Sequence, residues 1–176
     1  FRLTPDEPHA FGGLTSPEHY FEFRYKLQKD MEKAPALIEE TGREFQELFG
    51  RRLSLVDPYK CDDAEIILVT SGTTGYTARV AVDHFRQKGI KVGNLRVRVF
   101  RPFPFEVVNE ILSQARKVAV IDRNISYGHH GIFYQEVKSA LYGNSSVPVF
   151  GYITGLGGRD ITLETFRQII EQTQRS

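Results

Sequence analysis

The chain has 176 residues, of which 40% are hydrophobic, and a formal net charge of +1. Its length suits one domain with an extension, and its near-neutral charge gives no global electrostatic reason to expect nucleic-acid binding. A single cysteine, Cys61, excludes an internal disulfide framework and an iron–sulfur cluster ligated by this chain alone. No apolar run approaches the roughly 18 residues of a membrane helix, so we expect a cytoplasmic protein without a membrane partner.

The first 60 residues are predicted to form an extended linker and then a helical arm. Residues 1–16 carry prolines and a glycine pair without periodicity, as linkers do. Because the sequence opens in such a segment, we expect a piece of a longer polypeptide. Residues 17–60 are expected to be the arm, which starts at Ser16-Pro17. Pro35 is predicted to end its first helix and Gly50 its second.

Aromatic side chains crowd the start of this arm. Four of them lie between Tyr20 and Tyr25, too many for one narrow helical stripe. Either the helix is held between two bodies, or some rings are exposed. We therefore expect the isolated chain to fold and to self-associate through these residues.

Residues 61–176 alternate between strand and helix patterns. Strands are predicted at 65–70, 91–100, 117–122 and 147–153, and each is followed by apolar residues at helical spacing. Such alternation indicates an α/β fold with a mostly parallel sheet and helices on both faces.

The turn after the first of these strands, Ser71–Gly75, has the form of a phosphate-binding loop. It lacks the lysine of a P-loop, and only Gly72 and Gly75 of a three-glycine dinucleotide motif are present. The hydroxyls of Thr73 and Thr74 still lie at a helix N-terminus. We interpret the turn as a corner of the fold, with anion or partner contact as the alternative.

Two arginines occur in the second predicted strand. Arg96 and Arg98 share one face of it. A strand buried on both faces does not accommodate them, so the pattern indicates a solvated edge strand or a face covered by an acidic group.

Polar residues gather in the loop after the third strand, where α/β folds bind ligands. Asp122, Arg123, His129 and the adjacent His130 could form a metal or acid–base site. Adjacent histidines point in different directions, however, which disfavours a metal. Asp122 and Arg123 could instead form a local ion pair, and the loop could contact a neighbour.

A glycine-rich loop, residues 154–162, follows the last strand. Its three glycines permit positive φ or close approach by another segment. Asp160 or Thr162 is expected to cap the final helix.

Three stretches together resemble one known family. "VTSGTTGYTARVAVDHFRQKGIKVGNLRVRVFRPFP", "VAVIDRNISYGHHGIFYQEVKSAL" and "GYITGLGGRDIT" resemble core domain II of the α subunit of 2-oxoacid:ferredoxin oxidoreductases, of the pyruvate:ferredoxin oxidoreductase type. The resemblance implies a three-layer α/β/α sandwich similar to the C-terminal domain of transketolase, over residues 61–176.

The resemblance also implies a function for the complex to which such a domain belongs. The family decarboxylates a 2-oxoacid, most often pyruvate, on thiamine diphosphate with Mg2+, reduces ferredoxin through iron–sulfur clusters and acylates coenzyme A. These cofactors are implied to lie elsewhere in the complex, so the chain is expected to bind none of them and to be inactive alone. Its expected partners are the other domains and the β, γ and δ subunits, with ferredoxin an indirect partner.

Residues at the family's motif positions are carried over as interface or loop-ordering residues, and none as catalytic. They are Arg101, Asp122, Arg123, Arg159 and Asp160. With Thr73, Thr74 and His129 they form the predicted interface or ligand-loop set. The alternative is a free-standing α/β module that binds a small anion between the 72–75 turn and the 155–158 loop.

Overall fold

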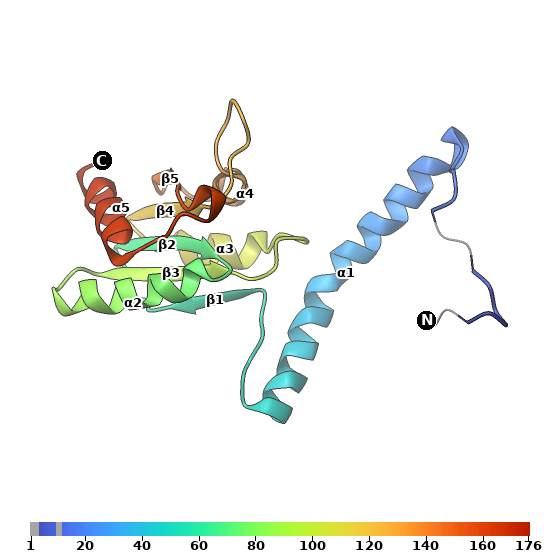
Figure 1. Cartoon of the computed structure of the whole chain (residues 1–176), viewed down its shortest axis with the longest axis horizontal. Helices are drawn as coiled ribbons and strands as arrows, with labels where there is room; N and C mark the ends of the chain where they lie inside the picture. The colour runs from blue at the N-terminus through green and yellow to red at the C-terminus, as the bar shows by residue number, and fades with distance from the viewer. Residues whose placement is uncertain (1–3, 10–11) are drawn as a thin grey trace.

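The computed structural model describes residues 4–9 and 12–176, and shows an α/β body from which one long helix extends (Figure 1). Part of the expected linker, residues 1–3 and 10–11, lies outside the described residues. The elements are α1 (Pro17–Phe49), β1 (Val56–Tyr59), β2 (Ile66–Ser71), α2 (Thr74–Gln87), β3 (Val92–Val97), α3 (Phe105–Leu112), β4 (Lys117–Asp122), α4 (Ile132–Leu141), β5 (Val149–Ile153), the 3-10 turn η1 (Leu156–Gly158) and α5 (Leu163–Arg175).

The sheet has five strands in the order β1-β3-β2-β4-β5, and two apolar layers cover it. Alternate side chains of β2, β3 and β4 face α3 and α4 on one side, where Val108, Leu112 and Val137 are fully buried. The other side chains of these strands face α2 and α5, where Ala78 and Phe166 are fully buried. This three-layer sandwich confirms the predicted fold class. The uninterrupted apolar runs of β2 and β4 are typical of strands covered on both faces.

The strand β1 was not predicted. It pairs antiparallel with β3, and Asp57 lies opposite Arg96. Pro58 can be accommodated because β1 is at the sheet edge, where a missing N–H is tolerated. The pairing makes β3 an inner strand, so the prediction of a solvated edge was wrong. The alternative, a strand face covered by an acidic group, is confirmed, and Asp57 is that group.

The helix α1 runs for 33 residues and continues through Pro35, so the predicted break there was wrong. Proline removes one helical hydrogen bond, at a cost of about 3 kcal/mol. The surrounding residues are mostly good helix formers, and one stripe of the helix is partly or fully buried. That stripe comprises Met31, Pro35, Ile38, Gly42 and Phe45. Gly50 ends the helix in the left-handed conformation, as predicted.

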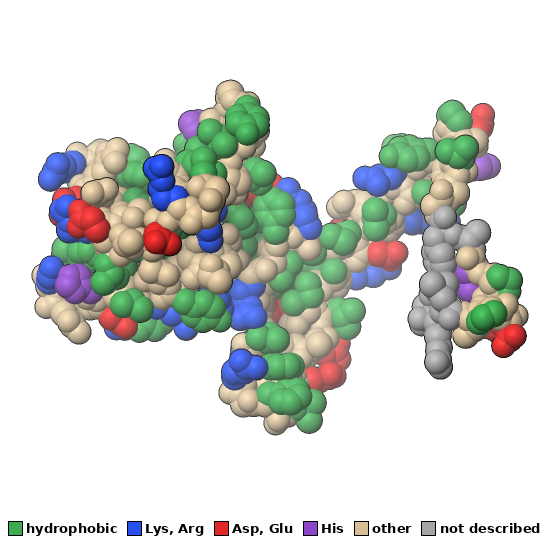
Figure 2. All heavy atoms as spheres, in the orientation of Figure 1, with side chains coloured by type: hydrophobic (Ala, Val, Ile, Leu, Met, Phe, Trp, Pro, Cys, Tyr) green, Lys and Arg blue, Asp and Glu red, His purple; other side chains and the backbone are tan. Residues whose placement is uncertain are grey.

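The two halves of α1 have different surroundings. The C-terminal half is joined to the segment before β1, because Glu39 accepts a hydrogen bond from the Leu55 N–H (2.9 Å) and pairs with Arg52. Figure 1 shows the N-terminal half extending away from the sheet. Its rings are exposed, at 74% for Phe21 and 60% for Phe23, and hydrophobic side chains line the visible helix in Figure 2.

Candidate functional site

A small cleft lies at the carboxyl ends of the parallel strands. It has a volume of about 200 Å³, and the turn after β2, the residue after β4 and the loop after β5 contribute to it. Five of the eight predicted residues meet here. Its lining is Thr73, Thr74, Thr77, Arg123, Gly158, Arg159, Asp160 and Ile161, and we call it the strand-end cleft.

Glycines shape the walls of the strand-end cleft. Gly72 has φ +56 directly after β2, so the chain turns sharply into α2. Gly155 has φ +71, and a Cβ there would lie 3.1 Å from the Arg123 Nε. A side chain at 155 would therefore strain the backbone and crowd Arg123. The cap of α5 is Thr162, whose hydroxyl accepts the Thr165 N–H, rather than Asp160.

Asp122 lies behind the strand-end cleft and fixes the start of α4. Its carboxylate accepts hydrogen bonds from the N–H groups of Phe133 (2.9 Å) and Tyr134 (3.0 Å) and from the Asn124 amide (3.0 Å). Asp122 is therefore used by α4 and does not form the ion pair with Arg123 that had been considered. Burial raises the pKa of Asp122, even though these three donors act to lower it.

His129 lies in the loop that protrudes between β4 and α4 (Figure 1). Its Nδ1 is 3.1 Å from the Gln135 Nε2, and its ring contacts that of His130 edge-on. It does not line the strand-end cleft. Within residues 4–9 and 12–176, no group of three or more His, Cys, Asp or Glu side chains is placed to hold a metal ion.

Arg101 lies apart from the strand-end cleft, at the junction of the body with α1. It forms an ion pair with Glu136 and stacks over Phe100, with 4.0 Å between the guanidinium carbon and the ring centre. The Arg101–Pro102 peptide bond is cis. Together with Met31 and Pro35 of α1, Arg101 lines a groove of about 420 Å³, so it lies where the arm approaches the body.

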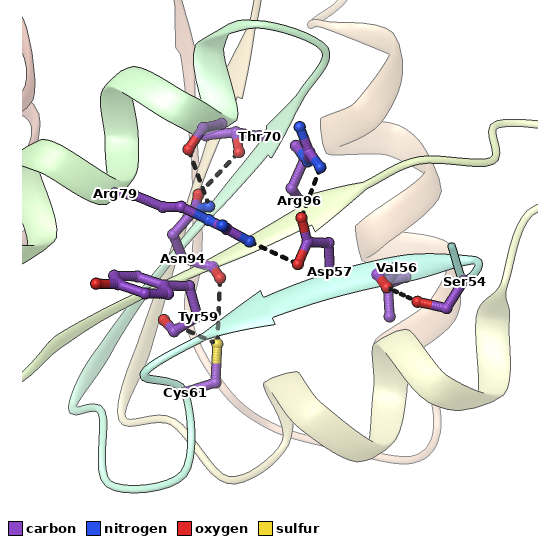
Figure 3. Close-up of polar contacts among 10 residues, drawn as sticks. Ser54, Val56, Asp57, Tyr59, Cys61, Thr70, Arg79, Asn94 and Arg96 are labelled. Carbon is purple, nitrogen blue, oxygen red and sulfur yellow. Dashed lines mark hydrogen bonds and ion pairs between the residues drawn. The ribbon is translucent and has the colours of Figure 1, made fainter. Parts of the chain in front are cut away.

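A second polar cluster, not anticipated in full, lies between α2 and β1 (Figure 3). Asp57 accepts one hydrogen bond from Arg79 and one from Arg96, each 2.6 Å long. The Arg96 guanidinium also lies 4.3 Å from the centre of the Tyr76 ring. Sequence reasoning identified Arg96 but missed Asp57, Arg79 and Tyr76. The sequence did contain a signal for Asp57, because an arginine in a buried strand requires an acidic partner.

Deeper in the same layer, two polar residues satisfy each other. The Thr70 hydroxyl donates to the Asn94 side-chain oxygen at 2.8 Å, and Figure 3 draws this contact as a dashed line. The Cys61 thiol approaches the backbone oxygen of Asn94 (3.4 Å). Burial raises the pKa of Cys61 to about 11, so at neutral pH it is a protonated thiol and a poor nucleophile.

The strand-end cleft therefore combines two arginines, three threonine side chains and one aspartate. Such groups can bind an anion or the polar surface of a neighbouring protein. The described part of the chain contains no helix with both the length and the apolar character of a membrane span.

Comparison with known proteins places these features in a family. The family model for pyruvate:ferredoxin oxidoreductase core domain II matches residues 64–166. The chain is 45% identical to pyruvate synthase subunit PorA of Methanothermobacter thermautotrophicus over 172 residues, which is 98% of this chain and 44% of the relative. It is 42% identical to ketoisovalerate oxidoreductase subunit VorA of Pyrococcus abyssi, over 97% of this chain and 44% of the relative.

Two solved structures share the fold. One is a 2-oxoglutarate:ferredoxin oxidoreductase from Magnetococcus marinus with 2-oxoglutarate, coenzyme A and succinyl-CoA bound, with a TM-score of 0.58 and 18% identity over 90% of this chain and 24% of that one. The other is a split-gene transketolase, an inactive β4 tetramer, with a TM-score of 0.52 and 15% identity over 65% of this chain and 39% of that one. The chain spans less than half the length of these curated relatives, and it belongs to the pyruvate:ferredoxin oxidoreductase core domain II family.

Proposed function

We propose that the chain is a non-catalytic interface domain of a multi-subunit 2-oxoacid:ferredoxin oxidoreductase, with pyruvate as its 2-oxoacid. The observation that carries the assignment to this class of complex is the identity to a pyruvate synthase subunit (45% across 98% of the chain) and to a ketoisovalerate oxidoreductase subunit (42% across 97%). Pyruvate is proposed because the resemblance implies it as the most frequent 2-oxoacid of the family. The complex would use thiamine diphosphate, Mg2+ and iron–sulfur clusters bound by its other domains and subunits. It would release CO2 and transfer electrons to ferredoxin and the acyl group to coenzyme A.

The residues at the strand ends support a structural role for the domain. Asp122 is occupied by three hydrogen-bond donors that fix the start of α4. The Arg101 guanidinium is already paired with the Glu136 carboxylate. The strand-end cleft, at about 200 Å³, is smaller than the pockets of roughly 300–1,000 Å³ that enclose whole small molecules. We therefore assign Arg123, Arg159 and Asp160 to contacts with a neighbouring domain or subunit.

The direct test uses the 176-residue chain. Calorimetry with thiamine diphosphate plus Mg2+, and separately with coenzyme A, should give no saturable heat at micromolar ligand concentrations. Pyruvate-dependent dye reduction by the chain alone should not exceed the buffer control. Saturable binding of thiamine diphosphate at micromolar concentration, or turnover by the chain alone, would refute the assignment of the cofactors to other parts of the complex.

We also propose that residues 17–49 act as an arm that binds a neighbouring protein surface. The expected arm, residues 17–60, includes β1, which pairs with β3, so we propose that the α/β domain begins at residue 56 and not at 61. Four exposed rings on α1 support this, at 55% for Tyr20, 74% for Phe21, 60% for Phe23 and 55% for Tyr25. Without its partner surface the chain should self-associate through these rings, because exposed apolar patches mark interaction sites.

Sedimentation of two single variants tests the arm. Phe21→Ser should reduce the self-associated fraction. Tyr142→Ser removes a ring that is more exposed than Phe21 (87% against 74%), at the end of α4, and should leave the self-associated fraction unchanged. Wild-type chain that stays monomeric at high micromolar concentration would contradict the proposal, as would equal effects of the two variants.

A second candidate is a free-standing module that binds a small anion. One observation favours it, because the 72–75 turn and the 158–161 loop do meet in the strand-end cleft. This reading predicts saturable phosphate binding that Arg159→Gln abolishes. It also predicts no co-elution with the other subunits of the oxidoreductase, whereas the interface reading predicts co-elution.

A further inference from the structure

A second hollow is also lined by the turn after β2. Its volume is about 210 Å³, and its lining comprises Gly72, Tyr76, Arg96, Val97 and Arg98. We call it the Arg96 hollow. It shares no lining residue with the strand-end cleft, and no part of the proposed function uses it.

Arg96 is an unusual residue for the position it occupies. It is only 7% exposed, and buried arginines normally have several of their five N–H donors paired. Its Nη2 donates to Asp57 at 2.6 Å, but its Nε is buried without a hydrogen-bond partner. The Nε of Arg79, the other partner of Asp57, is buried and unpaired in the same way. An unpaired donor on a buried cation is costly, and Arg96 lines the hollow, so a negative group there would meet a cation whose pairing is incomplete.

The local charge is also unbalanced. The single carboxylate of Asp57 is shared between Arg79 and Arg96, which leaves one positive charge in excess. Arg98 adds another, because it is exposed and pairs with no carboxylate among the described residues. One negative group seated beside both Arg96 and Arg98 would reduce this imbalance.

Packing holds the Arg96 side chain in place against the hollow. Gly75 lies so close that an added Cβ would come within 2.3 Å of the Arg96 Cδ. The Tyr76 ring covers the guanidinium, and Asp57 anchors its far end. The guanidinium is therefore preorganised, and little conformational entropy remains to be lost when a ligand binds.

We propose that the Arg96 hollow is an oxyanion-binding site for one carboxylate or phosphate group, held by Arg96 and Arg98. Its volume is below that of pockets for whole drug-sized ligands, so the site takes a single anionic group. This group is either a free phosphate or an acidic side chain of a neighbouring polypeptide, which share the same recognition chemistry. The proposal does not depend on the proposed function.

The test follows the Nε–H resonance of Arg96 by 15N NMR in the 176-residue chain. Inorganic phosphate and N-acetylglutamate amide are the two probes. A saturable shift is expected with at least one, and the probe that binds more tightly identifies the source of the group. Both affinities should fall as salt is added, because exposed ionic contacts are screened. Absence of a saturable shift with either probe at millimolar concentration overturns the proposal.

Three charge-matched variants locate the binding. Arg98→Gln should weaken it by about tenfold or more, the factor expected for one charged hydrogen bond. Arg116→Gln removes the same charge at the opposite end of the sheet, where the side chain is 78% exposed, and should change affinity less than twofold. Arg159→Gln, in the strand-end cleft, should behave like Arg116→Gln. If Arg159→Gln weakens binding as much as Arg98→Gln, the assignment to the Arg96 hollow is wrong.

Discussion

Replacing Gly75 with alanine should destabilise the protein, although alanine is the better helix former. Gly75 is buried near the start of α2, and alanine there would gain at most about 1 kcal/mol from helix propensity. The new Cβ, however, would lie 2.3 Å from the Cδ and 2.8 Å from the Cγ of Arg96. These are middle atoms of a buried side chain, so the whole side chain must move.

The magnitude follows from what that movement disrupts. Overpacking costs about 1–3 kcal/mol. Loss of the charged hydrogen bond from Arg96 to Asp57 costs about 1.5–3 kcal/mol more. After the propensity gain, Gly75→Ala should lower the free energy of unfolding by about 2–4 kcal/mol. For a chain of this size that corresponds to a Tm lower by about 5–15 °C.

A double-mutant cycle measured by urea unfolding and thermal melting isolates the cause. Of the three atoms nearest the new methyl, all in Arg96, only the Cβ at 3.2 Å remains in an Arg96→Ala background. There Gly75→Ala should be neutral or mildly stabilising, so the two changes should be coupled by about 2–4 kcal/mol. A Gly75→Ala protein that melts at or above the wild-type Tm, or an equal cost in both backgrounds, would refute the reasoning.

Three further predictions concern single sites. Asp122→Ala should lower the free energy of unfolding by about 2–3 kcal/mol, because it leaves buried N–H groups unpaired. Hydrogen exchange at the amides of Phe133 and Tyr134 should accelerate. Unchanged exchange would contradict the assignment of these two amides to the Asp122 carboxylate. Thr162→Ala should cost about 1 kcal/mol through loss of the α5 cap. Ser16→Ala should cost less in the same melts, because Ser16 makes no side-chain cap hydrogen bond, and equal costs would oppose this. Cys61 has a pKa of about 11 in the folded protein, so stability should fall by up to about 3 kcal/mol as pH rises from about 8.5 to 11. The unfolded thiol loses its proton first, which favours unfolding, and Cys61→Ala should remove this pH dependence.

The strands β2 and β4 were predictable because their apolar runs, residues 66–69 and 118–121, are uninterrupted. Isoleucine and valine in residues 66–69 leave few alternatives to a buried strand. The strand β1 was not predictable from its own four residues, since Asp57-Pro58 is typical of a turn. Its position depends on a tertiary contact, the pairing of Asp57 with Arg96.

The candidate site was predicted in composition but not in arrangement. Strand-end residues such as Thr73, Arg123 and Arg159 were identified from their places after strands. Their meeting in one cleft depends on the strand order β2-β4-β5, which local patterns do not encode. Likewise, the partners of Asp122 could not be known until the loop before α4 was seen to close back on it. Arg101 was grouped with these residues by sequence, yet it lies beside α1.

The continuity of α1 through Pro35 has a geometric consequence for the rings near its N-terminus. An α-helix advances about 1.5 Å and turns about 100° with each residue. Deleting one residue between Tyr25 and Pro35 would therefore rotate the rings by about 100° about the helix axis while barely changing their reach. Deleting seven would shorten the reach by about 10 Å and change the direction of the rings by only about 20°. The number of residues in α1 therefore sets two things separately: the direction in which the rings point and their distance from the body. With seven residues deleted, the rings would still point toward a surface that binds them, whereas with one residue deleted they would point away from it.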